Sequence, residues 1–163
     1  MLRSSSGRRN EMQQDVVIRS GRKDFVLLER FVEIGSSHVV GYASFQQALL
    51  YEGIEALAQL GAYHVRYLTD FSRHAFLLKI ADCPLPFGSL NGRYRLDGNL
   101  TGRAASSFSY DLSIDKAEEN RCAMKGRFLF AAVDYDERFR KDVLEKHYRK
   151  VFKCLQGDIE IGC

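Results

Sequence analysis

A row of polar residues that starts in the stretch LLYEGIEALAQLGAYHV (positions 49–65) has the residue types needed for acid–base chemistry. The row is spaced 3, 4, 4 and 3 residues apart and consists of Glu52, Glu55, Gln59, Tyr63 and Arg66. At about 100° per residue, these side chains share one face of an α-helix. A helix carboxylate beside a groove can act as a general acid or base. The same spacing is also typical of the solvated face of an amphipathic helix, in which case Glu52 and Glu55 need no function.

The helix that carries this row is predicted by a second, apolar row. Its members are spaced 4, 3, 4, 4 and 3 residues apart and are Leu50, Ile54, Leu57, Gly61, Val65 and Leu68. This spacing predicts one continuous helix from Gln46 to about Leu68, with its apolar side turned toward another element. Several alanines and Gly61 keep the helix slim, so we expect that element to pack closely against it.

Strands are predicted on both sides of the helix, where apolar and polar residues alternate. The predicted ranges are 31–34, 38–45, 75–82, 94–100, 108–114 and 122–130. The first two flank the turn residues Gly35-Ser36-Ser37 and should form a hairpin. The last three are joined by short polar connectors, so they should form an antiparallel meander.

The order of these elements predicts an α+β protein with an antiparallel sheet wrapped around the long central helix. A further amphipathic helix is predicted at 136–155. A chain of 163 residues is expected to form one domain. We therefore divide it into a flexible basic tail at 1–20, the α+β domain at 21–135, and a C-terminal helix with its tail at 136–163.

The positive charge is concentrated near the C-terminus. The formal net charge is +3, and the segment 137–156 alone holds seven Lys or Arg against three acids. We expect Arg140, Lys146 and Arg149 to form a docking surface for an acidic partner, although a solvated helix face has the same pattern. Because acidic residues interrupt the basic ones and no aromatic platform accompanies them, nucleic acid is not an expected partner.

The cysteines and the apolar runs indicate in which cellular compartment the protein is expected. Cys83, Cys122, Cys154 and Cys163 are far apart in the sequence and form no metal-binding cluster, so we expect no metal site. No apolar run reaches the roughly 18 residues of a membrane span. The N-terminal segment lacks the apolar core of a secretory signal. Free thiols and a cytoplasmic location are therefore expected.

Five stretches of the sequence resemble the 3-hydroxyacyl-acyl carrier protein dehydratases of the hotdog fold. These stretches, between about 24 and 133, are DFVLLERFVEI, SSHVVGYASF, IEALAQLGAY, AFLLKIADCPLP and LNGRYRLDGNL. The most specific is EALAQ at 55–59, which is similar to the E-A-M/L-A-Q helix motif of that family. The resemblance implies a homodimer without a cofactor, whose acyl tunnel lies at the subunit interface.

The resemblance also implies a substrate and a site. The substrate would be a thioester of acyl carrier protein or coenzyme A. Glu55 would occupy the catalytic acid position and Gln59 the position of the motif glutamine. We expect Phe45, Glu52 and Tyr63 to contribute to substrate binding.

The sequence departs from the family pattern just before the helix. The family has a histidine loop there, H-F-P-G-x-P-x-x-P-G, whereas this chain has GYASFQQALL, with Gly41 at the histidine position. The remaining histidines, His38, His64, His74 and His147, are expected to be structural or solvated. A histidine from a partner chain stays an alternative.

Three functions therefore remain open from the sequence. The first is an acyl-thioester-binding protein related to the dehydratases, with or without dehydratase activity. The second is a thioesterase in which Glu55 or Glu52 activates water or attacks the thioester. The third is a dimeric accessory subunit without chemistry, whose basic helix meets an acidic carrier protein.

Overall fold

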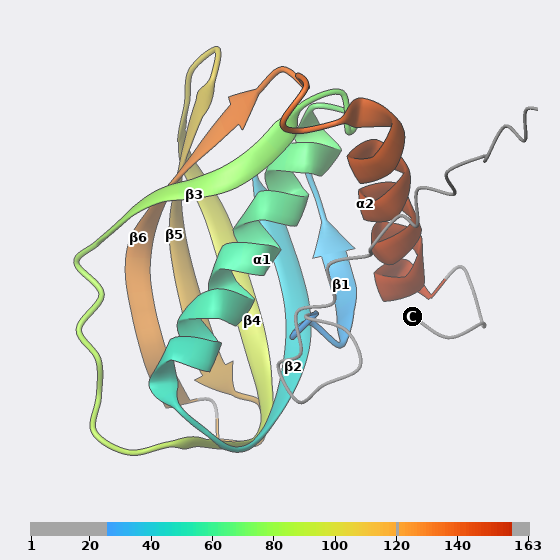
Figure 1. Cartoon of the computed structure of the whole chain (residues 1–163). Coiled ribbons are helices and arrows are strands. Elements are labelled where there is room, and N and C mark those ends of the chain that lie inside the picture. The colour runs from blue at the N-terminus through green and yellow to red at the C-terminus, as the bar shows by residue number, and fades with distance from the viewer. Residues whose placement is uncertain (1–25, 120, 158–163) are drawn as a thin grey trace, which may run out of the picture.

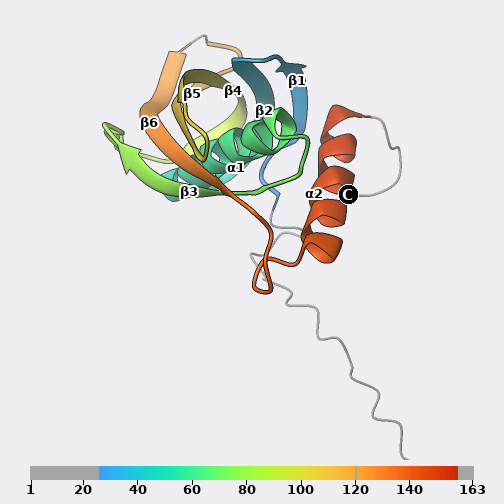
Figure 2. The same cartoon turned by 90° about the horizontal axis from the view of Figure 1, so that it is seen from above.

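A computed structural model describes residues 26–119 and 121–157. Its elements are β1 (Arg30–Ile34), β2 (His38–Ala48), α1 (Leu50–Leu68), β3 (His74–Ala81), β4 (Leu90–Arg103), β5 (Ser107–Lys116), β6 (Arg121–Val133) and α2 (Lys141–Gln156). The six strands form one antiparallel sheet in the order β1-β2-β4-β5-β6-β3. The sheet curls around α1, and α2 stands beside β1 (Figures 1 and 2).

The alternating pattern of the long strands sets which face of the sheet meets α1. On β5, Phe108, Tyr110, Leu112 and Ile114 are all buried, while the residues between them are more exposed. Leu96 on β4 and Phe128 on β6 are fully buried on the same concave face. The meander and its buried face are confirmed, because period-2 alternation follows the two sides of a strand directly.

The start of α1 differs from the prediction. The helix begins at Leu50 and not at Gln46, because residues 46–48 extend β2 and Ala48 pairs with Leu90 of β4. A bulge lies between Phe45 and Ala48, and Gln47 within it has a φ of 49°. This left-handed residue turns the chain from the strand into the helix within a few positions.

The start of α2 is also later than the prediction of 136. The carboxylate of Asp136 accepts hydrogen bonds from the backbone N–H groups of Arg138 and Phe139, each at 2.8 Å. These bonds hold a turn before the helix, which then begins at Lys141. Short polar side chains commonly compete with helical hydrogen bonds in this way.

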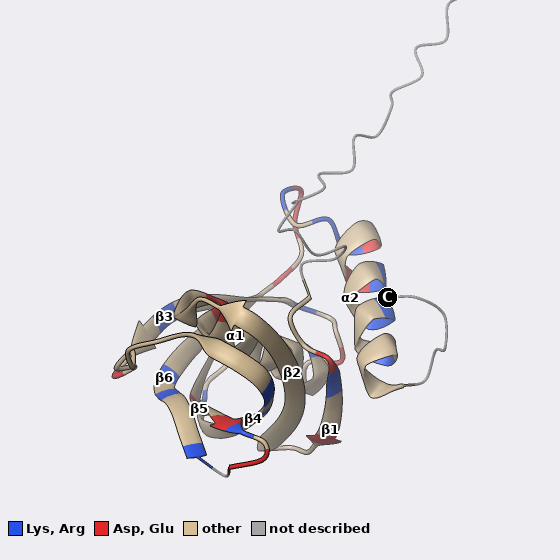
Figure 3. Ribbon diagram, turned by 90° about the horizontal axis from the view of Figure 1, so that it is seen from below, with Lys and Arg blue, Asp and Glu red and all other residues tan. Residues whose placement is uncertain are grey.

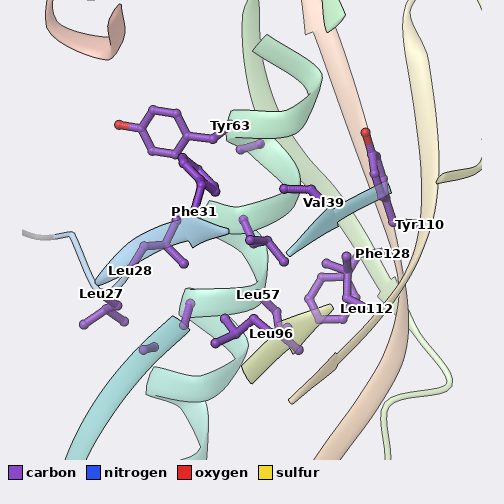
Figure 4. Close-up of a cluster of buried hydrophobic side chains, with 14 of the residues drawn as sticks. Leu27, Leu28, Phe31, Val39, Leu57, Tyr63, Leu96, Tyr110, Leu112 and Phe128 are labelled. Carbon is purple, nitrogen blue, oxygen red and sulfur yellow. The ribbon is translucent and has the colours of Figure 1, made fainter. Parts of the chain in front are cut away.

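α1 lies very close to the sheet at two glycines. A Cβ at Gly61 would overlap the ring of Phe130, and one at Gly53 would lie 2.6 Å from the Leu90 side chain. The large side chains of the sheet therefore fill the space that a glycine leaves open. Figure 4 shows part of this core, with Leu57 of α1 and Leu96 of β4 facing each other.

α2 covers the C-terminal half of α1. Phe152 of α2 lies 5.2 Å from Phe31 and 5.1 Å from Phe71, measured between ring centroids. Tyr63 and Arg66 of α1 are buried beside α2, although both belong to the row of polar residues predicted from the sequence. The solvated-face interpretation is therefore wrong for these two residues, because a helix from the other end of the chain covers them.

Three sequence predictions concern the N-terminal tail, membrane spans and the cysteines. The tail predicted at 1–20 lies outside the described residues. No helix in the described ranges has the length and apolarity needed to cross a membrane. Cys83 and Cys122 are free as expected, but Cys154 is disulfide-bonded, so the free-thiol prediction is wrong for that residue.

Candidate functional site

Glu55 and Gln59 form a connected pair on α1. The side-chain amide of Gln59 donates a hydrogen bond to Glu55 Oε1 at 3.1 Å, and Gln59 Oε1 accepts one from the backbone N–H of Leu27 at 2.9 Å. Both side chains are half-buried. The carboxylate is thus oriented by a neighbour that is itself held in place, while part of it remains accessible.

The segment before β1 supplies the backbone group that holds Gln59. Leu27 and Leu28 are buried next to α1, as Figure 4 shows, and Glu29 continues into the hairpin through a hydrogen bond from its N–H to the carbonyl of Tyr42. Two leucines in succession bind this segment to the helix by burial of apolar surface. The Leu27 contact was missed by sequence reasoning, since a backbone N–H has no side-chain signature.

Glu52 lies one turn before Glu55 and is also half-buried. No side-chain hydrogen bond or ion pair within the described ranges joins it to Glu55 or Gln59. The structure therefore places the two carboxylates on the same side of α1 without connecting them.

Phe45 and Tyr63 lie in the interior. Phe45 is 1% exposed and packs edge-on against Tyr94, with ring centroids 5.7 Å apart. Tyr63 packs against Phe31 and against Phe152 of α2, and burial raises its pKa to about 12. In a single chain, both residues contribute to the core.

The two arginines predicted to bind a partner are engaged within the chain. Arg140 forms a two-pronged contact with Asp142, at 2.6 and 3.2 Å. Arg149 contacts Glu145 at 3.0 Å, the Asp70 carboxylate at 3.2 Å and the Asp70 carbonyl at 2.6 Å. Lys146, the third predicted residue, is exposed.

His64 is a structural residue. One ring nitrogen lies 2.8 Å from the carbonyl of Gly35 and the other 2.8 Å from the hydroxyl of Tyr110. Because a carbonyl can only accept, Nε2 carries the proton and Nδ1 accepts the bond from Tyr110. Burial lowers the pKa of His64, which keeps this neutral form.

The other histidines also lie away from the Glu55–Gln59 pair. His38 lies between Glu33 and Asp97, at 3.3 and 3.5 Å. His74 is buried and stacks on Phe139, and burial lowers its pKa. The remaining one, at position 147 on α2, is exposed. No histidine of the described ranges contacts Glu55, so this part of the chain gives the carboxylate no imidazole partner.

Arg66 is a buried cation that sequence reasoning assigned to the polar row. Its guanidinium lies 3.8 Å from the ring centre of Tyr148 and 5.0 Å from that of Tyr63, and Nη2 donates a hydrogen bond to the carbonyl of Ala75 at 2.8 Å. The aromatic faces take the place of a carboxylate partner. This cluster fastens α2 to α1 and has no visible catalytic geometry.

Two surface hollows are clear in the described ranges, and neither is lined by Glu55. The first follows α2 and is lined by Lys141, Asp142, Glu145, Lys146, Arg149, Lys150 and Lys153. The second lies between the loop after β3 and the start of β6, and is lined by Pro84, Leu85, Pro86, Cys122, Ala123, Met124 and Lys125. The described residues contain no cluster of His, Cys, Asp and Glu side chains suited to a metal ion.

Comparisons with known proteins give matches only among solved structures. No family model and no curated protein matches the sequence. A thioesterase variant from Pseudomonas aeruginosa is 12% identical with a TM-score of 0.55, and the match covers 64% of this chain and 81% of that one. A thioesterase variant from Staphylococcus aureus is 12% identical with a TM-score of 0.55, and the match covers 63% and 91%.

A dehydratase heterocomplex from Xenorhabdus doucetiae is also similar, at 14% identity and a TM-score of 0.52, with 71% of this chain and 86% of that one covered. The span from Arg30 to Val133 is 104 of 163 residues, or 64%, so the sheet and α1 alone are large enough for the two thioesterase matches. The strand order, the central helix and these neighbours together show that the chain has the hotdog fold.

Proposed function

We propose that the protein binds acyl thioesters and hydrolyses them, with Glu55 as the general base and Gln59 as the residue that positions it. The observation that carries this proposal is the hydrogen-bonded chain from the Leu27 N–H through Gln59 to Glu55. Several of the similar structures are thioesterases, which supports the reaction class. Coenzyme A and acyl carrier protein in the cytoplasm are the expected acyl carriers.

The chemistry needs one base and one site for negative charge. Glu55 takes a proton from a water molecule while the water oxygen bonds to the thioester carbonyl carbon, and the charge moves to the carbonyl oxygen. When this intermediate collapses, the C–S bond breaks and the thiolate takes the proton from Glu55, which leaves the acid and the free thiol. The first turn of α1 has no side-chain cap, so its N–H groups, apart from that of Glu52, which donates to the Leu49 carbonyl, suit the oxyanion.

Hydrolysis is preferred over dehydration because no histidine of the described ranges contacts Glu55. Dehydration of a 3-hydroxyacyl thioester needs a base for the α-proton and an acid for the departing hydroxyl. In the dehydratase family that this sequence resembles, a histidine works with the helix carboxylate. In this chain Gly41 has the corresponding position, and its backbone is packed against Arg30 and Leu60.

A second candidate is an accessory subunit of a dehydratase. One of the matched structures is a dehydratase heterocomplex, so a chain of this fold occurs there beside a different one. In this alternative, the partner chain supplies the acid–base residue that faces Glu55. The protein alone would then bind thioesters without turning them over.

The acyl slot is proposed to form between two copies of the chain. No described strand pairs with the outer edge of β3, whereas α2 stands beside the opposite edge at β1 (Figure 2). Leu78 on β3 is 56% exposed, and Phe87 in the following loop is fully exposed. Unpaired edges with apolar side chains are typical places for association. A homodimer through β3 would complete a wall near α1.

A panel of substrates tests this function. Purified protein is incubated with plain acyl-CoA and 3-hydroxyacyl-CoA thioesters of several chain lengths, and free thiol and loss of water are followed separately. The proposal predicts thiol release from both kinds of thioester without loss of water. Water loss without thiol release would identify a dehydratase, and binding without either product would favour the accessory subunit.

A further inference from the structure

A row of three lysines runs along the outer face of α2. Lys146, Lys150 and Lys153 are spaced four and three residues apart and are all exposed. At about 100° per residue they fall within about 60° of each other, and they span about 10 Å of the helix. The buried residues Phe152 and Leu155 point to the opposite side. Figure 3 shows basic residues along this outer side of α2, away from the sheet.

These lysines differ from the other basic residues of the helix. Arg140, Lys141 and Arg149 are each paired with a carboxylate of the chain. No ion pair with a described residue is found for Lys146, Lys150 or Lys153. The pair of Arg149 with Asp70 joins α2 to the segment after α1, and the other pairs lie within the α2 segment. The lysine row is free to meet an external anion.

The inner face of α2, opposite the lysine row, contacts the same helix that carries Glu55. Phe152 and Tyr148 of α2 pack against Tyr63, which follows Glu55 by eight residues. Eight residues of helix correspond to about 12 Å. A partner that docks on the outer face of α2 would therefore need a flexible arm longer than about 12 Å to reach Glu55.

The surroundings of the row favour an acidic protein as the partner. The apolar face of α2 is already buried against α1 and β1, so it is not available to enter a membrane. The described residues that line the hollow beside the row all belong to α2. Lysines are flexible point charges that suit electrostatic attraction to an acidic surface.

We propose that the lysine row is the docking surface for an acidic protein that carries the acyl group on a thioester arm. The second half of this statement rests on the proposed function. Charges that are exposed in this way act mainly on the rate and the salt dependence of association. The α2 helix would thus select the protein-borne thioester over the same acyl group on free coenzyme A.

Binding of an acyl carrier protein tests the docking surface directly. The probe is an acidic acyl carrier protein loaded with a non-hydrolysable thioester analogue, and its affinity is measured by fluorescence anisotropy at two salt concentrations. The triple variant Lys146→Glu, Lys150→Glu, Lys153→Glu should bind about tenfold more weakly, since three exposed pairs of roughly 0.5 kcal/mol each are lost. Its affinity should also depend less on salt.

A matched variant has the same change of charge elsewhere. It replaces the exposed basic residues Arg103, Arg121 and Lys125 by Glu. This control should bind the carrier within about threefold of the unmodified protein, and both variants should hydrolyse free acyl-CoA at the unmodified rate if the proposed function holds. Equal loss of binding in both variants would overturn the docking proposal, as would tighter binding of anionic vesicles than of the carrier.

The two proposals fail in different ways. If the unmodified protein hydrolyses no thioester but loses carrier binding only in the lysine variant, the docking surface stands and the hydrolysis proposal fails. If the unmodified protein hydrolyses acyl-CoA but the lysine variant binds the carrier normally, the hydrolysis proposal stands and the docking surface fails.

Discussion

At the scale of single residues, the site depends on one carboxylate and the groups that hold it. Gln59 lies four residues after Glu55, so the helix itself brings the two side chains together. The Leu27 N–H then fixes the orientation of Gln59 from outside the helix. A base held in this way has fewer conformations to lose when the substrate binds.

Gly61 is expected to be sensitive to the smallest substitution. In Gly61→Ala the added methyl would overlap the ring of Phe130, which has no space to retreat in the core. We predict a loss of about 1–3 kcal/mol in the free energy of unfolding, measured by urea denaturation. The control is Gly102→Ala, whose Cβ would lie 3.6 Å from Ser109 and should change stability by less than about 0.5 kcal/mol. Equal stability of the two variants would contradict this packing.

His64 should make stability depend on pH. Burial lowers its pKa in the folded state, so below about pH 6.5 the unfolded chain binds a proton that the folded chain does not. The free energy of unfolding should therefore fall as the pH drops below that value, until it passes the lowered folded pKa, and His64 should have no such effect at higher pH. Urea midpoints at about pH 7.5 and pH 5 measure the difference.

The variant His64→Gln should show a smaller pH difference than the unmodified protein. His147→Gln changes an exposed histidine on α2 and should leave the difference as it was. An unchanged difference in the His64 variant would mean that carboxylates or His74 cause the pH dependence.

At the scale of elements, α2 is the addition that changes the role of α1. It converts the C-terminal half of the polar row into an interface, where Arg66 lies over the Tyr148 ring and Tyr63 packs on Phe152. The N-terminal half, with Glu52 and Glu55, stays half-exposed. One helix therefore contains both a structural contact and the candidate site.

Phe152 should account for much of the attachment of α2. Phe152→Ala removes a ring that lies within 6 Å of Phe31, Tyr67 and Phe71. We predict that the free energy of unfolding, measured by urea denaturation, falls by about 3–5 kcal/mol, or that α2 detaches at a lower urea concentration than the rest of the protein unfolds. The control Val143→Ala changes a 46% exposed side chain on the same helix and should alter stability by less than about 0.5 kcal/mol. A neutral Phe152 variant would mean that α2 is attached by other contacts.

The elements also show what the sequence could and could not predict. The faces of β4, β5 and β6 follow from alternation, and the pairing of Glu55 with Gln59 follows from helical spacing. Neither the start of α1 nor the burial of Tyr63 is encoded locally. The start of α1 depends on the pairing between Ala48 and Leu90. The burial of Tyr63 depends on α2, which lies about 90 residues further along the chain. Such contacts leave no periodic signal.

At the scale of the whole molecule, the free edge of the sheet should set the oligomeric state. Leu78 on β3 and Val32 on β1 are equally exposed, at 56% each, on opposite edges. If two copies pair through β3, Leu78→Asp should shift the protein from dimer to monomer in sedimentation velocity, because a buried carboxylate would have no partner. Val32→Asp should leave the dimer intact. A dimer that survives the first change but not the second would place the interface at β1.

The central claim is that the Glu55 carboxylate activates water at a thioester, and the most direct measurement is the rate of thiol release by Glu55→Gln. This change keeps the size of the side chain and an oxygen that can accept the bond from Gln59, but removes the base. For Glu55→Gln we predict a fall of at least about a hundredfold in kcat, with thermal stability preserved. In the control Glu52→Gln, one turn away, kcat should fall by less than about threefold. Thiol release by the Glu55→Gln variant at the unmodified rate would contradict the account.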